Sequence, residues 1–317
     1  MTTMDNRQKV DLSIIIVNWN VRDHLRECLN SIYEKTSGIT FEIIVVDNAS
    51  SDSSVEMVRT VFPQVKLLAN SENLGFARAN NLALPSTVGE YLGLLNPDTV
   101  LINNTFGMMI AELEAEPKIG IVGPKLLSSK GTVQEPCARR FITLKSRIQW
   151  LITSRRITTP FSEFLPMAEY ANSQSVDCIS GACLILKRDV LIDNRIFDPQ
   201  FFMYFEDVDL CYETIQRGWT VFYLSEALVM HHGGLSAIQD PISIVLYTVR
   251  TTYFFLIKRY GRLTAFIFRF FCAVIPATKL TITWLIRLIP RYRRDPLWLE
   301  RSTLYLQMIW CTLHIEQ

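Results

Sequence analysis

Two stretches of the chain carry carboxylates at positions where they could do chemistry. The first is Tyr91–Thr99, YLGLLNPDT, an apolar run typical of a buried strand that ends at Asn96, Pro97 and Asp98. Pro97 cannot donate a ladder hydrogen bond, which predicts that the strand stops there and leaves Asp98 at the sheet's rim. In open α/β sheets ligands bind at this edge. An Asp in a loop is also a common helix N-cap, so this position alone leaves both roles open.

The second stretch is Phe201–Cys211, FFMYFEDVDLC, where aromatic residues run directly into Glu206, Asp207 and Asp209. Acidic residues at a helix start are favoured by the helix dipole alone. A carboxylate held beside Phe and Tyr side chains is also partly desolvated, which makes it a better proton acceptor. The pattern therefore predicts either a charged helix start or a general base.

Two of the four histidines, His231 and His232, lie beside two glycines in ALVMHHGGLS, residues 227–236. Imidazole on a backbone that bends closely is suited to binding a metal ion, and a histidine packed in the core is the alternative.

Alternating strand and helix patterns would position these groups. The predicted strands are Asp11–Val17, Phe41–Val46, Val65–Ala69, Tyr91–Leu95, Ile119–Gly123, Cys178–Lys187 and Thr220–Leu224. Helical spacing between the first strands predicts βαβ units, and therefore an α/β fold with a mostly parallel central sheet flanked by helices.

Polar loops follow four consecutive predicted strands. Four such loops in a row indicate a ligand-binding edge of the sheet, whereas any one of them alone would be typical of a solvated turn. They contain Asn18, Asp47, the segment Asn70–Asn81 and Asp98. The sequences G-x-G-x-x-G and Walker A do not occur, which disfavours dinucleotide dehydrogenases and P-loop kinases. Further along, the Arg139–Arg140 pair could meet phosphates, although a solvated basic pair is the commoner arrangement.

Composition predicts one large domain, or one domain with an appendage, from 317 residues of which 49% are hydrophobic. The seven cysteines form no C-x-x-C pair and are odd in number, which favours a reducing, cytosolic setting. The polar start, Met1–Asp11, predicts no cleaved signal peptide.

The charge divides unevenly along the chain. From Asp240 onward there are 11 Lys and Arg against 4 Asp and Glu, which leaves 21 against 27 before it. We therefore predict two domains, residues 1–240 and 241–317.

The C-terminal region is aromatic as well as basic. Within Ile242–Ile289 the longest uncharged run, Phe270–Thr278, has nine residues, fewer than the roughly 20 that a helix needs to span a bilayer. In one continuous helix, Lys258, Arg262, Arg269 and Arg287 would form a stripe opposite the apolar residues. Such a basic amphipathic region would lie on an anionic membrane surface, and a helix packed on the first domain is the alternative.

Six motifs in order resemble the inverting nucleotide-sugar glycosyltransferases of family 2, which have a GT-A fold, and among them the rhamnosyltransferase-like bacterial members. They are the strand before Asn18-Trp19-Asn20, DNAS at Asp47, NLGFARANN at Asn73, NPDT at Asn96, FFMYFEDVDLC at Phe201 and H-x-G-G-x-S at His231.

The resemblance implies roles for individual residues. Nucleotide-binding residues would be Asn18, Asp47 at the nucleobase, Asn73, Gly75, Asn80, Asn96 and Asp98. Asp98 and His231 would bind Mg²⁺ or Mn²⁺, with Asn96 standing where the family has the first Asp of D-x-D. Asp207 would be the catalytic base, with Glu206 as its neighbour.

The implied function is metal-dependent hexosyl transfer from a dTDP- or UDP-sugar, best matched by dTDP-rhamnose, to a lipid-linked or polysaccharide acceptor in cell-surface glycan synthesis. The enzyme would be cytoplasmic and peripheral on the inner face of the membrane, with no nucleic-acid partner. The alternatives are a non-catalytic sugar-nucleotide or glycan-binding member of the fold and a nucleotidyltransferase. The retained Asp98, Asp207 and His231 favour activity, and the absence of a Gly- and Arg-rich loop after the first strand disfavours the nucleotidyltransferase.

Overall fold

A computed structural model describes residues 10–135, 137–153, 163, 165–233, 241–287 and 298–314. The chain forms two compact units. The α/β unit comprises Met1–Phe141, Leu165–Phe202 and Glu206–Ser236, and the helical unit comprises Ile142–Phe164, Met203–Phe205 and Ala237–Gln317. The domain boundary predicted at residue 240 lies outside the described residues and stays a prediction.

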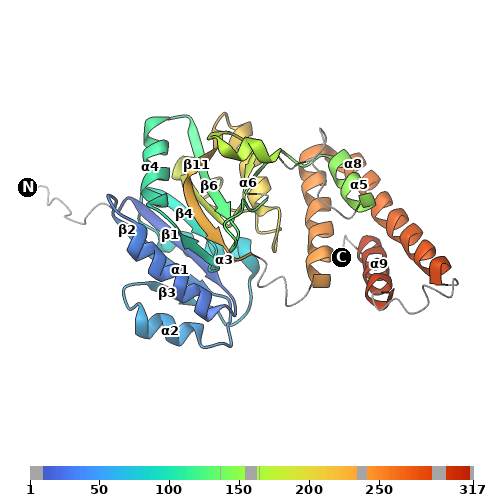
Figure 1. Ribbon diagram of the computed structural model, residues 1–317, viewed down its shortest axis with the longest axis horizontal. Coiled ribbons are helices and arrows are strands. Elements are labelled where there is room, and N and C mark those ends of the chain that lie inside the picture. The colour runs from blue at the N-terminus through green and yellow to red at the C-terminus, as the bar shows by residue number, and fades with distance from the viewer. Residues whose placement is uncertain are drawn as a thin grey trace, which may run out of the picture. The chain divides into compact units, whose positions relative to one another are not determined.

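The α/β unit alternates strands and helices along most of its length (Figure 1). Its elements are β1 (Leu12–Asn18), α1 (Arg22–Lys35), β2 (Phe41–Asp47), α2 (Ser54–Val61), β3 (Lys66–Ala69), α3 (Gly75–Ala83), η1 (Leu84–Ser86), β4 (Tyr91–Leu95), β5 (Thr99–Leu101), α4 (Thr105–Ala115), β6 (Ile119–Leu127), β7 (Ala138–Arg139), η2 (Met167–Ala171), β8 (Gln174–Ser175), β9 (Cys178–Ile179), β10 (Cys183–Lys187), η3 (Arg188–Val190), α6 (Glu206–Gln216) and β11 (Thr220–His231).

One mixed sheet organises the described part of this unit. Its strand order is β3-β2-β1-β4-β10-β6-β11-β5, with β8 paired to β11. Strands β3, β2, β1 and β4 are parallel, β10 is antiparallel to both β4 and β6, and β11 is parallel to β6. The α/β class is confirmed, and the parallel arrangement is confined to part of the sheet.

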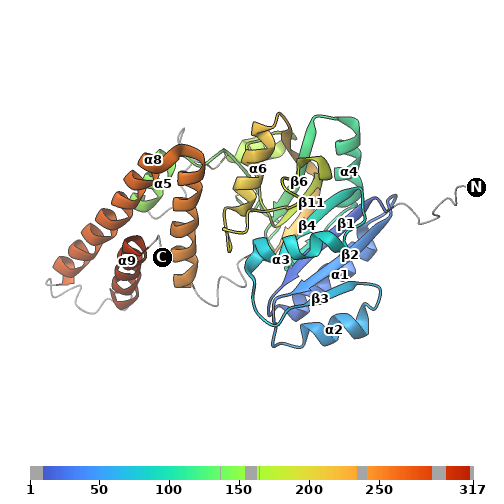
Figure 2. The same cartoon turned by 180° about the vertical axis from the view of Figure 1, so that it is seen from behind.

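Burial on both faces explains the apolar strand sequences. Every residue of β1 and β4 is buried, because α1 covers one face of the sheet and α3 the other (Figures 1 and 2). The register pairs Asn18 with Asp47, and Asp47 with Ala69. The carboxyl ends of the four parallel strands therefore meet at one edge, as the sequence predicts.

The predicted strand Cys178–Lys187 is broken into β9 and β10. Residues 180–182 leave the ladder, so that Gly181 N donates to the Asp207 carboxylate and Ala182 O accepts from Asn96 N. The apolar run predicted one strand because the hydrogen bonds that interrupt it come from residues distant in the sequence.

The helical unit contains α5 (Leu144–Thr153), α8 (Pro241–Arg287) and α9 (Trp298–Leu313). Its core consists of Leu151, Val249, Tyr253, Leu256, Ala265, Phe268, Cys272 and Met308. Arg269 donates to the carbonyl oxygens of Thr312 and Leu313 at the end of α9, where a positive charge also complements the helix dipole.

The predicted stripe of four basic residues is wrong, because α8 is not one continuous helix. Gly261 has φ 85° and ψ 168°, a conformation that glycine adopts readily, and it divides α8 into two rods (Figures 1 and 2). Lys258 and Arg262 therefore lie on different rods. Arg269 is engaged by α9, and the side chain of Arg287 lies outside the described residues.

By length and composition, one segment of the described helices, Val245–Ile286, could cross a membrane. Its most apolar window is 22% buried, which is low for a core helix. The prediction that this region lies on a membrane surface instead of spanning it stays a prediction.

Candidate active site

At the ends of β1 and β2, Asn18 and Asp47 hold each other in place. Asn18 Nδ2 donates to Asp47 Oδ1 at 2.8 Å and to Ser50 Oγ at 3.1 Å, while Ser50 N donates to Asp47 Oδ2 at 2.9 Å. Asn18 Oδ1 is buried without a hydrogen-bond partner among the described residues. An unpartnered buried acceptor is costly, so this edge offers an acceptor to a ligand's N–H or O–H group.

The loop after β3 makes the predicted tight turn. Asn73 Oδ1 accepts a hydrogen bond from Gly75 N at 2.9 Å, and Asn48 Nδ2 donates to Gly75 O at 3.1 Å. Gly75 has φ +77°, and a Cβ atom there would lie 2.5 Å from the carbonyl oxygen of Phe202. Only glycine allows this approach, which brings the start of α3 against the chain preceding Glu206.

Asn80 lies inside the packing of α3, buried to 1% exposure. Its Nδ2 donates to Phe76 O, one turn earlier, at 2.9 Å. The structure therefore gives this side chain a local role, and its contact with a nucleotide stays a prediction.

At the end of β4, Asn96 and Asp98 face His231 from the end of β11. Asp98 Oδ1 lies 3.3 Å from His231 Nε2, and Asn96 Nδ2 lies 3.4 Å from the same nitrogen. On the other side of the ring, Gln134 Oε1 lies 2.7 Å from His231 Nδ1. Strand β5 follows Asp98 directly, so Asp98 caps no helix and the N-cap alternative is excluded.

This arrangement fits a divalent metal ion. If His231 Nδ1 donates to Gln134, then in the neutral ring the Nε2 lone pair and the Asp98 carboxylate are two acceptors facing each other. A proton or a metal ion between them removes the conflict. Two ligands at right angles around Mg²⁺ or Mn²⁺ lie about 3 Å apart, close to the separation observed. Gln134 fixes the ring as outer partners of metal-binding histidines do.

The electrostatics of Asp98 agree with a charged carboxylate. Burial raises the pKa of Asp98, but the neighbouring His231 and several weaker effects together lower it by more, so the net shift is downward. The carboxylate is therefore anionic at neutral pH, as a metal ligand must be.

The other predicted carboxylate, Asp207, forms a buried ion pair with Arg139. Arg139 Nη2 lies 3.2 and 3.1 Å from the two Asp207 oxygens, and the two side chains are 17% and 11% exposed. Burial lowers the pKa of Arg139, and the charge of Asp207 is the largest of several effects that together raise it by more, so the guanidinium stays protonated. The interpretation of Arg139 as half of a solvated basic pair is wrong, whereas Arg140 is 45% exposed.

Two consecutive residues connect the Asp207 pair with the Asp98 cluster. Gly181 N donates to Asp207 Oδ2 at 3.1 Å, and the next residue, Ala182, accepts from Asn96 N at 2.9 Å. The break between β9 and β10 therefore holds the predicted base beside the predicted metal ligands. Asp207 and the Asp98 cluster come together at one edge of the sheet.

Glu206, next to Asp207, is buried and mainly neutral. Its pKa is raised from 4.5 to about 8, first by burial and then by the negative charge of Asp207. Its Oε2 has no hydrogen-bond partner among the described residues. A neutral Glu206 cannot act as a base at pH 7, and Asp207 stays the predicted base.

The Glu206 shift predicts how stability depends on pH. Between pH 4.5 and about 8 the folded chain keeps a proton on Glu206 that the unfolded chain has lost, so stability falls as pH rises through this window. We expect Glu206→Gln to remove this penalty and to gain stability over wild type by up to about 1.4 kcal/mol per pH unit. Urea unfolding at several pH values measures it, with the exposed Glu114→Gln as a control that should show no trend.

Sequence reasoning missed several groups of the site. Gln134 and Arg139 lie in an irregular region without strand or helix periodicity. Gln134 pairs with His231, 97 positions away, and Arg139 pairs with Asp207, 68 positions away. His24, which lies on α1 near His232, was hidden among the polar residues of a helix. The only sequence signals for these groups were their residue types.

Sequence comparison finds relatives that handle sugars. An N-acetylglucosaminyl-diphospho-decaprenol L-rhamnosyltransferase of Mycobacterium tuberculosis is 27% identical over 264 residues, covering 79% of this chain and 85% of the relative. The low-salt glycan biosynthesis hexosyltransferase Agl10 of Haloferax volcanii is 26% identical over 206 residues, covering 64% and 61%.

Solved structures share the fold. The mannosyltransferase PcManGT of Pyrobaculum calidifontis, in complex with GDP-Man and Mn²⁺, gives a TM-score of 0.57 at 15% identity and covers 97% of this chain and 87% of its own. GalNAc-T7 with UDP, GalNAc and Mn²⁺ gives 0.52 at 15% identity, covering 71% and 44%. At this identity the likeness establishes a GT-A-like architecture alone.

The family model described as "Glycosyl transferase family 2" matches residues 13–193, more than half of the chain and the segment that carries Asp47, Asp98 and Arg139. Together with the sugar-transferring relatives this shows that the chain is a glycosyltransferase and belongs to glycosyl transferase family 2.

Proposed function

We propose that this glycosyltransferase moves a sugar, best matched by rhamnose from dTDP-rhamnose, to a hydroxyl of a lipid-linked or polysaccharide acceptor in cell-surface glycan synthesis, with inversion. The observation that carries the proposal is that Gly181 N donates to Asp207 while the next residue, Ala182, accepts from Asn96, which lies beside Asp98 and His231. The mycobacterial rhamnosyltransferase, whose name specifies a diphospho-decaprenol substrate, supports the choice of sugar and acceptor.

Asp207 would accept the proton of the acceptor hydroxyl. A sugar hydroxyl has a pKa far above neutral, so it must lose its proton as it attacks the anomeric carbon. Arg139, Gly181 N and Val208 N hold the Asp207 carboxylate in one orientation. A single base on the acceptor side suits direct displacement, which inverts the anomeric configuration.

Asp98 and His231 would hold Mg²⁺ or Mn²⁺, which neutralises charge on the departing nucleoside diphosphate when bound. Asn96 would contact the diphosphate beside them. The Asn18 and Asp47 pair would contact the nucleobase. The buried Asn18 Oδ1, which has no hydrogen-bond partner among the described residues, supports this role. The turn at Asn73 and Gly75 would line the same pocket.

A panel of UDP-, dTDP- and GDP-sugars with Mg²⁺ or Mn²⁺ tests the donor. We expect dTDP-rhamnose to raise the unfolding temperature most, and only with metal, because ligands that bind the folded state stabilise it. The controls are each metal alone and each free nucleotide. Equal shifts of the unfolding temperature for all nucleotide sugars that share one nucleotide would contradict the assignment to rhamnose. No shift of the unfolding temperature with any donor would contradict the proposed function.

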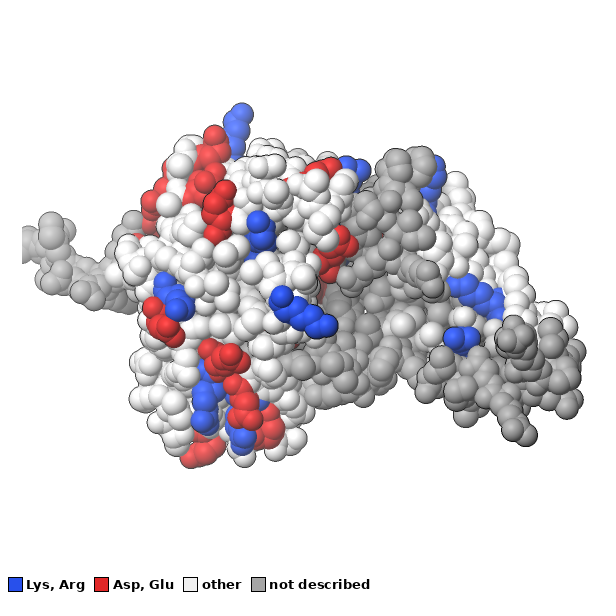
Figure 3. Space-filling model, viewed as in Figure 1, with Lys and Arg blue, Asp and Glu red and all other residues white. Residues whose placement is uncertain are grey.

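We further propose that the helical unit binds the cytoplasmic face of the membrane. Leu263, Phe266 and Phe270 are 74%, 65% and 55% exposed and recur at helical spacing on the second rod of α8. On the face that Figure 3 shows, the charged side chains drawn over the described part of this unit are basic. Apolar side chains beside basic ones suit the interface of an anionic membrane.

We expect the full chain to sediment with anionic liposomes and high salt to weaken this only in part, since screening leaves the inserted apolar groups unaffected. The triple variant Leu263→Gln, Phe266→Gln and Phe270→Gln should lose most of the binding. A matched triple of exposed apolar residues in the α/β unit, Val61, Leu82 and Val88 each replaced by Gln, should keep it. Equal binding by both triple variants would refute the membrane surface.

A further inference from the structure

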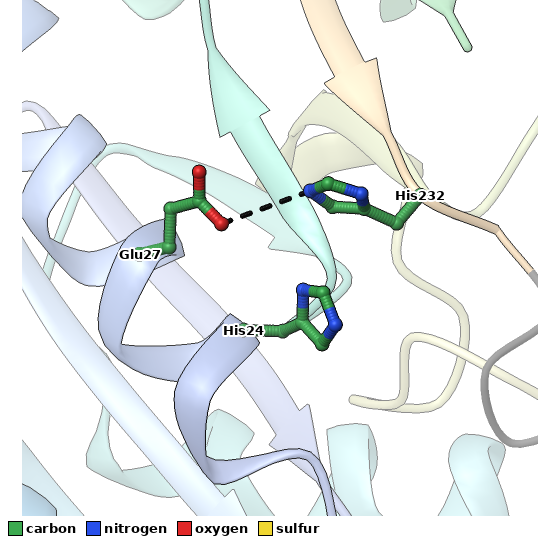
Figure 4. Close-up of side chains that lie close together, drawn as sticks. All are labelled: His24, Glu27 and His232. Carbon is green, nitrogen blue, oxygen red and sulfur yellow. Dashed lines mark ion pairs between the residues drawn. The ribbon is translucent and has the colours of Figure 1, made fainter. Parts of the chain in front are cut away.

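A second cluster of metal-binding side chains lies beside the Asp98 site. His24 and Glu27 on α1 and His232 after β11 each offer one ligand atom, and these atoms lie within 4.8 Å of one another (Figure 4). Glu27 Oε2 is 3.7 Å from His232 Nε2, too far for a hydrogen bond, and the two imidazole centroids are 4.7 Å apart.

Local geometry sets these three side chains facing one another. His24 and Glu27 are three residues apart, so they share one face of α1. His232 is held opposite that face, because its N–H donates to Asp98 O at 2.9 Å. Successive side chains of an extended chain point to opposite sides, so His231 faces Asp98 while His232 faces α1.

One ring nitrogen of each histidine in this cluster lacks a hydrogen-bond partner among the described residues. His24 Nδ1 and His232 Nε2 are both buried and have no partner among the described residues. A buried polar nitrogen without a partner is costly. One bound cation could satisfy two such nitrogens through their lone pairs.

We propose that His24, Glu27 and His232 bind one transition-metal ion of the Zn²⁺ type, separate from the ion proposed at Asp98 and His231. Two imidazole nitrogens and one carboxylate oxygen are a donor set typical of zinc and leave one position open. Tetrahedral ligands at about 2.1 Å from zinc lie about 3.4 Å apart. Side-chain rotations that move the three ligand atoms by roughly 1 Å would therefore complete the site.

The ion would link α1 to the end of β11. His232 directly follows His231, so the linkage would fix the chain that presents His231 to Asp98. This role goes beyond the proposed function and does not depend on which sugar is transferred.

Calorimetric titration of metal-depleted, tag-free full chain with Zn²⁺ tests the site. We expect one tight site in wild type and at least about tenfold weaker binding in His24→Gln and Glu27→Gln. Glu27 is 51% exposed, so its substitution leaves folding intact. The matched controls, Glu34→Gln on the same helix and His314→Gln, the remaining histidine, should bind as wild type does.

Asp98→Asn separates the two sites and should retain this zinc site. Co²⁺ bound to wild type should show the intense visible absorption of low-coordinate cobalt and lose it in Glu27→Gln. Unchanged zinc binding in His24→Gln and Glu27→Gln, or its loss in Asp98→Asn alone, would overturn the proposal. So would the absence of zinc binding in wild type. No arm uses a nucleotide sugar, so the result is independent of the proposed transfer reaction.

Discussion

Asp207→Asn is expected to lower turnover by at least ~10², with donor affinity near that of wild type, because the amide keeps the carboxylate's shape and cannot accept the acceptor's proton. The structure adds a reason for the unchanged donor affinity. Gly181 N and Arg139 can still donate to the amide oxygen, so the break between β9 and β10 stays in place. Steady-state release of nucleoside diphosphate with acceptor, beside donor titration, measures both quantities.

Two controls accompany this measurement. Arg139 loses its charge partner in Asp207→Asn, so thermal unfolding of the same protein must show that it is folded. Glu206→Gln should keep much of the turnover, because Glu206 is already neutral at pH 7. If Asp207→Asn turns over normally, the base lies elsewhere, and Asp209 is the next carboxylate to substitute.

Asp98→Ala is expected to abolish metal-dependent binding of the nucleotide sugar. The site has Asn96 where a second acidic ligand would stand, so removing Asp98 leaves His231 to face the diphosphate without an anionic ligand. Donor titration with and without Mn²⁺ measures the effect. Asp23→Ala, an exposed substitution on α1, is the control and should behave as wild type. Equal donor affinity with and without metal in both wild type and Asp98→Ala would contradict the metal role.

The sequence predicted the strands and the edge where the site lies, because buried parallel strands have near-continuous apolar sequences and polar residues mark their ends. Asp98 was singled out for this reason, Asp207 because an aromatic run leads into acidic residues at a helix start, and the motif order supported both. His231 was found from its neighbouring glycines. These signals are local, so they can be recognised in the sequence without knowledge of the tertiary structure.

What the sequence did not predict depends on contacts between distant residues. The Arg139 ion pair spans 68 residues and comes from a two-residue strand, which has no periodicity of its own. The strand interruption at Gly181 and Ala182 provides hydrogen bonds to Asp207 and Asn96, and neither of these two residues is near it in the chain. Gly261 divides α8 inside an otherwise helical pattern, where an isolated glycine is usually tolerated.

The anomeric configuration of the product tests the central claim most directly. With the donor that the panel identifies and its acceptor, nuclear magnetic resonance of the purified product reads the new linkage. One base at Asp207 and no covalent intermediate predict that the configuration is opposite to that of the donor. A product that retains the donor's configuration would contradict the account, because retention requires a different mechanism at the anomeric carbon.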